Sequence, residues 1–184
     1  QNELDALKDQ INPHFLFNAL NSIAELIHQD PNKAENAILK VSTFLRNTME
    51  EKALILLDEE IRNVHDYVEL ENIRFSGQIT FNIDSMMPHI YLPKFSLQLL
   101  VENAIKHGFQ HGNALHISLT YNKKENALQL QNDGKPIISK KFGTGLSNLE
   151  QRLRLLCKGS VKITQMDKPT FAIYLGECYE NIDR

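Results

Sequence analysis

The spacing of apolar residues changes near residue 53, and this change limits the folds open to the chain. Before it, apolar residues recur about every 3.6 residues, as on one face of an α-helix. After it, short runs of alternating apolar and polar residues, typical of strands, separate segments of helical period. The sequence therefore predicts an α+β chain with a helical domain over residues 1–52 and a mixed domain over residues 53–184.

Two helices joined by a short turn are expected in the first domain. One should cover residues 3–28, and the next should follow the turn at Asp30-Pro31-Asn32, because proline suits the first turn of a helix. Such a hairpin buries only one side of each helix, so the remaining apolar surface favours a homodimeric four-helix bundle. The apolar stripes contain Leu16, Leu20, Ile23 and Ile27 in the first helix, and Ala34, Ile38, Val41, Leu45 and Thr48 in the second.

The apolar stripe of the first helix changes sides at Pro13, and His14 and Asn18 belong to a separate, polar face. This proline lacks a backbone N–H donor and crowds the preceding turn, so we expect it to bend the helix just before His14. His14 and Asn18 lie one turn apart, which predicts an outward imidazole with an amide beside it. A neutral imidazole has an unprotonated nitrogen that can act as a nucleophile. A single histidine on a helix is more often an ordinary surface residue, so the surrounding motif has to decide.

The run Asn12-Pro13-His14-Phe15-Leu16-Phe17-Asn18 resembles the phosphoacceptor motif of the LytS-type sensor histidine kinases. The resemblance implies that His14 accepts the γ-phosphoryl group of ATP. The commoner histidine kinases carry an acidic residue immediately after the histidine, and Phe15 stands in that place here. The base that orients His14 must therefore come from elsewhere. Asn18 is a candidate for positioning the imidazole or, later, a hydrolytic water.

A second informative segment covers residues 92–108, where Pro93 is expected to begin a helix. Asn103, Lys106 and His107 are spaced to share one face of that helix. An amide oxygen suits Mg²⁺, and the two nitrogen-bearing side chains suit phosphate oxygens, although a polar helix face is more often merely solvated. The block Glu102-Asn103-Ala104-x-x-His107-Gly108 resembles the N box of histidine-kinase ATP-binding domains. In that box Glu102 is a candidate for a metal-shell or base role.

Asn132-Asp133-Gly134 follows the second strand of a predicted hairpin. The resemblance places the G1 box here, which is usually Asp-x-Gly-x-Gly, with the aspartate accepting the adenine amino hydrogen. Asn132 stands in the aspartate's place, and Pro136 stands at the second glycine. Asn132 can accept through its amide oxygen without a charge, so adenine should be held less tightly. Alternatively, Asp133 takes this role, and the sequence does not decide between them.

A third segment, Gly143-Thr144-Gly145-Leu146-Ser147-Asn148, opens a predicted helix. Glycines before a helix N-terminus let backbone N–H groups approach an anion, and the helix dipole favours phosphate there. The segment resembles the G2 box, in which Asn148 and Arg152 also match the family pattern. The loop between Gly134 and Gly143 would then be the ATP lid. The ATP-binding residues implied by this box are Gly143, Thr144, Gly145, Leu146, Asn148 and Arg152.

Composition excludes some classes of function. A formal net charge of -3 over 184 residues argues against direct nucleic-acid binding, because nucleic-acid surfaces of proteins are strongly basic. The sequence has no run of about 18 apolar residues that would cross a membrane. Its first residues lack an initiator methionine and a helix cap, so we expect the cytoplasmic portion of a longer, membrane-bound protein. Cys157 and Cys178 show no metal-ligand pattern and are expected to fill the core in a reducing compartment.

The motifs occur in the family's order from Leu7 to about Leu175. They imply a helical dimerisation and phosphotransfer hairpin, followed by an α/β sandwich of the GHKL (Bergerat) ATPase type. The implied activity is autophosphorylation of His14 by ATP with Mg²⁺, then transfer to an aspartate of a response regulator, commonly one with a LytTR-type DNA-binding domain. Two alternatives are a GHKL-type ATPase in which His14 is incidental, and a signalling scaffold that has lost catalysis, which Asn132 and Pro136 motivate.

Overall fold

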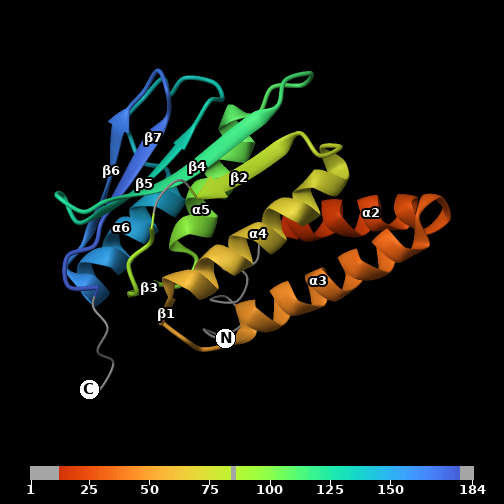
Figure 1. Cartoon of the computed structure of the whole chain (residues 1–184), viewed down its shortest axis with the longest axis horizontal. Coiled ribbons are helices and arrows are strands. Elements are labelled where there is room, and N and C mark those ends of the chain that lie inside the picture. The colour runs from red at the N-terminus through yellow and green to blue at the C-terminus, as the bar shows by residue number, and fades with distance from the viewer. Residues whose placement is uncertain (1–12, 84–85, 179–184) are drawn as a thin grey trace. The chain divides into compact units, whose positions relative to one another are not determined.

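The computed structural model describes residues 13–83 and 86–178 (Figure 1). These residues form two compact units, one of residues 13–51 with 65–77, and one of residues 52–64 with 78–178. The helix α4, Leu57–Arg74, contributes its first part to the second unit and its last part to the first. The functional division between residues 1–52 and 53–184 stays a prediction.

The helical unit consists of α2 (Pro13–Gln29), α3 (Pro31–Met49) and the end of α4. Asp30 caps α3 by accepting a hydrogen bond from the backbone N–H of Lys33 at 3.0 Å, and Pro31 occupies the first turn as predicted. The bend expected ahead of His14 involves residues 3–12, which lie outside the described residues.

The buried stripes of the hairpin differ from the predicted ones. They contain Phe15, Ala19 and Ile23 in α2, and Ala34, Ala37, Val41, Phe44 and Thr48 in α3. Leu20, Ile27 and Ile38, predicted in the stripes, are about half exposed. The reason is aromatic packing, because the Phe15 ring lies 5.1 Å from the Phe44 ring and 4.7 Å from the Tyr67 ring of α4, between centroids. A third helix therefore decides which side of the hairpin is buried.

A mixed sheet forms the centre of the second unit. Within the described residues its strands run in the order β2 (Ile79–Ile83), β4 (Leu115–Asn122), β5 (Ala127–Asn132), β7 (Thr170–Tyr174) and β6 (Ser160–Gln165). The β2 and β4 strands are parallel, and the other neighbours are antiparallel. The predicted alternation is confirmed in β4, where Leu115, Ile117 and Leu119 are buried. A separate antiparallel pair joins β1 (Leu54–Leu56) to β3 (Tyr91–Pro93).

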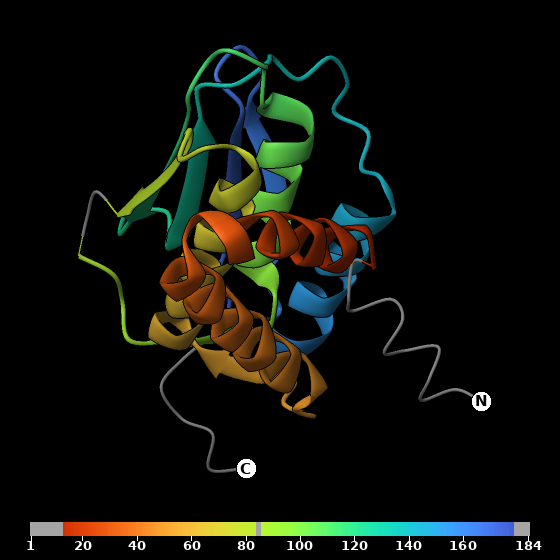
Figure 2. The same ribbon diagram turned by 90° about the vertical axis from the view of Figure 1, so that its right-hand side faces the viewer.

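Helices α5 (Ser96–Asn103) and α6 (Thr144–Cys157) lie on the same face of this sheet (Figure 2). The predicted helix start at Pro93 is wrong by three residues, because Pro93 is the last residue of β3 and pairs with Leu54. The predicted buried stripe of α5 is confirmed, as Leu97, Leu100 and Val101 are fully buried. A π-helical turn, η1 (Ala104–Gly108), continues α5.

Cys157 and Cys178 are both buried, as predicted for core residues, but the structure joins them in a disulfide. The prediction that the two thiols only fill the core is therefore corrected. The cause lies in the turns around them, because Lys158 ends α6 in a left-handed conformation and Gly176 (φ 55°) turns the chain back. The backbone N–H of Glu177 then donates to the carbonyl of Cys157 at 2.6 Å.

Among the helices of the described residues, we find none with the length and apolar character that crossing a membrane requires.

Candidate functional site

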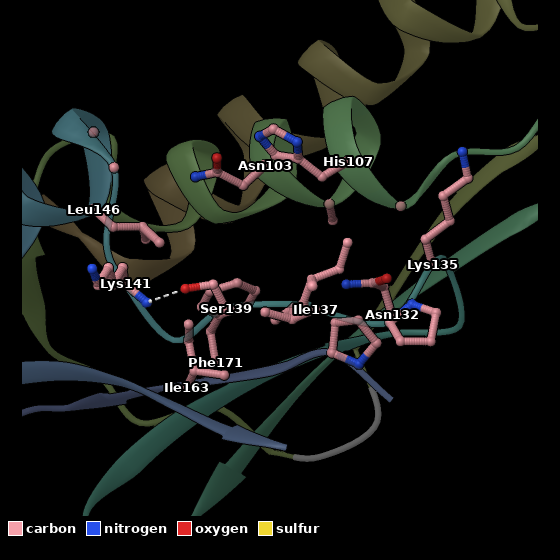
Figure 3. Close-up of a pocket in the computed structure, with 17 residues that line it drawn as sticks. Asn103, His107, Asn132, Lys135, Ile137, Ser139, Lys141, Leu146, Ile163 and Phe171 are labelled. Atoms are coloured by element: carbon pink, nitrogen blue, oxygen red, sulfur yellow. Dashed lines mark hydrogen bonds between the residues drawn. The ribbon is translucent and has the colours of Figure 1, made fainter. Parts of the chain in front are cut away.

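A pocket of about 500 Å³ lies in the second unit, where η1, the segment after β5 and the start of α6 meet strands β6 and β7. Figure 3 shows Asn103 and His107 on one side of it, and Ile163 and Phe171 on the other. Three segments that the sequence singled out separately thus contribute to one cavity. Of the predicted site residues, it is lined by Asn103, His107, Asn132, Gly143, Gly145 and Leu146.

The π-helical turn decides which residues of the N-box segment reach the pocket. Asn103 ends α5, and His107 projects beside it from η1. Lys106 is exposed and does not line the pocket. Of the three residues predicted to share one helix face, Asn103 and His107 therefore reach the pocket and Lys106 does not. A π-turn is wider than an α-turn and shifts the residues that follow, which a regular helical period does not anticipate.

The side-chain amide of Asn103 uses its nitrogen in a hydrogen bond to the backbone. Its Nδ2 donates to the Leu99 carbonyl at 2.9 Å. This hydrogen bond fixes the side chain on the pocket wall and leaves Oδ1 as an oxygen ligand of the type that Mg²⁺ prefers. Glu102, the predicted metal-shell or base residue, does not line the pocket, and its Oε1 accepts from Gln98 Nε2 at 2.9 Å.

Asn132 and Asp133 point to different surroundings. Asn132 is 2% exposed and lines the pocket. Asp133 is outside the lining residues and binds His116 through both carboxylate oxygens, at 2.7 Å to the backbone N–H and 2.6 Å to Nδ1. Although burial raises the pKa of Asp133, the hydrogen bonds from His116 hold it below its usual value. Of these two residues, Asn132 is the one with a side chain at the cavity.

The N-terminus of α6 supplies the opposite end of the pocket. Gly143, Gly145 and Leu146 line it, whereas Thr144 and Asn148 are exposed and do not. A helix start with glycines presents backbone N–H groups to an anion. The segment between Gly134 and Gly143 adds Lys141, whose backbone N–H donates to Ser139 Oγ at 3.2 Å (Figure 3).

Arg152 has a structural position rather than a place in the pocket. Its guanidinium donates to the Lys94 carbonyl and faces the carboxylate of Glu60. Glu60 is fully buried and accepts the backbone N–H groups of Phe95, Leu97 and Gln98, at 3.0, 3.0 and 3.2 Å. It therefore caps α5, the helix that carries Asn103, in place of the N-cap residue Phe95, which makes no side-chain cap. Burial raises the pKa of Glu60 to about 7, although these hydrogen bonds and Arg152 favour the ionised form.

His14 is exposed on α2, as predicted. The Asn18 amide nitrogen lies 3.2 Å from its Nδ1 and 3.5 Å from its Nε2, so the predicted pair is in contact. Glu71 of α4 interacts electrostatically with His14. Burial raises the pKa of Glu71, while Arg74, Tyr67 and His14 favour its charged form. An acidic side chain of another helix thus interacts with His14, whereas the residue that follows His14 in the sequence is Phe15.

The comparisons with known proteins agree with these motifs. The histidine kinase family model matches residues 2–79. Sensor protein LytS of Staphylococcus haemolyticus (strain JCSC1435) is 36% identical over an alignment covering 82% of this chain and 30% of the relative. Sensor protein LytS of Streptococcus mutans serotype c (strain ATCC 700610 / UA159) is 37% identical, with 84% and 30% covered. The chain belongs to the LytS-type sensor histidine kinases.

The chain spans about 30% of the length of these curated relatives. The solved catalytic domain of histidine kinase ThkA, at 21% identity, superposes with a TM-score of 0.51 over 71% of this chain and 100% of that domain. This similarity shows the fold, an α+β architecture of the GHKL type, and confirms the predicted fold class.

Several lining residues of this LytS-type domain were missed by sequence reasoning. Ile137, Ile163 and Phe171 give the pocket an apolar wall. Ile137 and Ile138 form an apolar pair in a loop that carries three lysines, Lys135, Lys140 and Lys141, and that contrast was the available signal. Ile163 and Phe171 carried no such signal, because an alternating strand does not tell which of its residues border a cavity.

Proposed function

We propose that this chain is the kinase core of a two-component sensor, which phosphorylates His14 with ATP and passes the phosphoryl group to an aspartate of a response regulator. The observation that carries this proposal is the pocket of about 500 Å³ at which the N-box, G1 and G2 segments meet. The family of the chain supports the same conclusion.

The pocket has two chemically different ends. Ile137, Ile163 and Phe171 offer apolar surface on which a nucleobase can be buried. Gly143 and Gly145 offer backbone N–H groups at the start of α6, and Lys141 adds a positive charge from the lid. We therefore expect the base against the apolar wall and the phosphates at the N-terminus of α6.

Asn103 fits the role of a Mg²⁺ ligand because its Oδ1 remains available after Nδ2 binds the Leu99 carbonyl. The described residues contain no cluster of three or more His, Cys, Asp or Glu side chains able to hold a metal ion. A single protein oxygen is sufficient for Mg²⁺ bound with ATP, which usually keeps several waters and takes further ligands from the phosphates.

His14 would form the new N–P bond while the bond between the γ-phosphorus and the bridging oxygen of ADP breaks. Asn18, at 3.2 Å from the imidazole Nδ1, would hold the ring orientation. Glu71 would stabilise the positive charge that develops on the imidazole as the phosphoryl group arrives.

A homodimer is part of the proposal. Apolar side chains remain exposed on the helical unit at Phe17, Leu20, Ile27, Ile38, Leu39 and Met49. On α2, Phe17, Leu20 and Ile27 follow one another at intervals of three and seven residues, the spacing of a helix seam, which suits a bundle made by two hairpins. We further propose that the response regulator carries a LytTR-type domain, that this chain binds no nucleic acid itself, and that it is the cytoplasmic part of a membrane protein.

Incubation with γ-labelled ATP and Mg²⁺ tests the proposal. We expect acid-labile label on the protein that is lost in His14→Gln and kept in His28→Gln, a matched change of an exposed histidine on the same helix. Release of free phosphate without labelled protein would instead indicate an ATPase. Failure to bind any nucleotide would indicate a scaffold.

A further inference from the structure

The side-chain amide of Asn132 is turned so that its nitrogen faces the pocket. Its Oδ1 accepts the backbone N–H of Gly134 at 3.0 Å. The same oxygen lies close to Gly108, since a Cβ on Gly108 would be 3.0 Å from it. In Figure 3 the amide nitrogen points toward Ile137, in the middle of the pocket, and the oxygen points away. Asn132 thus offers a hydrogen-bond donor to a ligand.

The orientation follows from hydrogen bonding. A backbone N–H can donate only to the oxygen of the amide, so the Gly134 contact assigns oxygen and nitrogen to their sides. Asn132 is only 2% exposed, and its side-chain amide cannot turn over without breaking this hydrogen bond. The donor is therefore a fixed feature of the wall.

A donor and a carboxylate select different purines. An ionised carboxylate only accepts, so it pairs with the 6-amino group of adenine and repels the 6-oxo group of guanine or hypoxanthine. An amide nitrogen donates, so it pairs with the 6-oxo oxygen, or with the ring nitrogen N1 of adenine. Asn132 removes the repulsion against 6-oxopurines and adds an attraction to them.

No other lining residue restores the preference for adenine by charge. Among the described residues that line the pocket, none is an aspartate or a glutamate, and the ionised side chains are those of Lys135 and Lys141. Asp133, the adjacent carboxylate, is bound to His116 through both oxygens.

We propose that Asn132 makes this pocket accept 6-oxopurine nucleoside triphosphates alongside ATP. This inference rests on the proposed nucleotide-binding function and concerns the choice of base within it. Guanosine and inosine triphosphates share the 6-oxo group, and inosine triphosphate lacks the 2-amino group, so it isolates the contact at position 6.

The substitution Asn132→Asp tests the inference with little change of shape. An aspartate keeps an oxygen for the Gly134 N–H and replaces only the donor by an acceptor. We would measure displacement of a fluorescent trinitrophenyl ATP analogue by ATP, inosine triphosphate and guanosine triphosphate. For the wild-type chain we expect inosine triphosphate to compete within about tenfold of ATP. In Asn132→Asp that ratio should shift toward ATP by about tenfold or more, as expected for a reversed polar contact.

Asn113→Asp adds the same charge in the exposed turn before β4, outside the pocket, and should keep the wild-type ratio. Thermal unfolding of Asn132→Asp checks that the domain remains folded. A wild-type chain that binds ATP but not inosine triphosphate, or an unchanged ratio in folded Asn132→Asp, would overturn the inference and leave the proposed kinase function standing. Absence of ATP binding in the wild type would overturn both.

Discussion

Gly134 and Gly108 lie against each other through their backbones, so that a Cβ added to Gly134 would stand 2.6 Å from the Cα of Gly108. The backbone N–H of Lys135 also donates to the Gly108 carbonyl at 3.0 Å. The N-box segment and the G1 segment are thereby joined at one edge of the pocket. A side chain at Gly134 would force the two backbones apart, whereas a Cβ on Gly108 would stand 3.0 Å from Asn132 Oδ1 and 3.5 Å from the Cα of Gly134.

Gly134→Ala should therefore lower both stability and nucleotide affinity. We expect a loss of about 2 kcal/mol in the free energy of unfolding, typical of overpacking against backbone, and weaker displacement of a fluorescent ATP analogue. Gly143→Ala is the matched control for stability, because a Cβ there meets nothing within 4 Å and its φ of -76° suits alanine. Equal melting temperatures for the two variants would contradict the close approach.

Glu71→Gln should slow phosphorylation of His14 by about tenfold or more, since a charge that favours the positively charged imidazole is removed. Nucleotide affinity should not change. The rate is measured from the label incorporated at a saturating ATP concentration.

Glu69→Gln is the control, because Glu69 is an exposed carboxylate on the same helix that pairs with Lys40. Glu71→Asp keeps the charge and should recover much of the rate. A rate in Glu71→Gln equal to that of Glu69→Gln would show that Glu71 only packs the helical unit.

Glu60 should make stability depend on pH. Its pKa is raised from 4.5 to about 7, so the folded domain binds this proton more tightly than the unfolded chain does. The stabilisation is fully present below pH 4.5 and is lost as pH rises through about 7. The free energy of unfolding, measured with denaturant, should fall less between about pH 5 and about pH 8 in Glu60→Gln than in the wild type.

Asp58→Asn changes an exposed carboxyl at the start of the same helix, and its free energy of unfolding should fall with pH as much as that of the wild type. If the free energy of unfolding of Glu60→Gln falls as much as that of the wild type, the pH dependence arises at other groups.

Phe17→Glu should convert the proposed homodimer into monomers. Phe17 is 67% exposed, so a charge there costs little in the monomer but would be buried in a bundle of two hairpins. Sedimentation velocity measures the mass. Leu155→Glu is the control, because Leu155 is 74% exposed on α6, and this variant should have the same mass as the wild type. If Phe17→Glu is still a dimer, the interface lies elsewhere.

The sequence predicted well where one local rule decides the outcome. The alternation through Leu115 and Ile117 predicted β4, and Pro31 after Asp30 predicted the start of α3. Asn103 and Asn132, which belong to two separate motifs of the sequence, line the same pocket, while their roles in binding stay a prediction.

Features that depend on distant parts of the chain were not predictable in this way. Tyr67 selects the buried face of α2 by packing on Phe15, although more than fifty residues separate them in the numbering. Glu60 caps α5 from another helix, and a helical period does not reveal the π-turn that leaves Lys106 exposed. In each case the competing influence was tertiary packing rather than local propensity.

The sharing of α4 between the two units has a mechanical consequence. Glu60 and Glu71 stand on one uninterrupted helix, eleven positions apart in the numbering, or about 16 Å along its axis. Glu60 caps α5 within one unit, and Glu71 interacts with His14 within the other, so the two ends of α4 serve different units. One residue inserted between these two carboxyls would twist one relative to the other by about 100°.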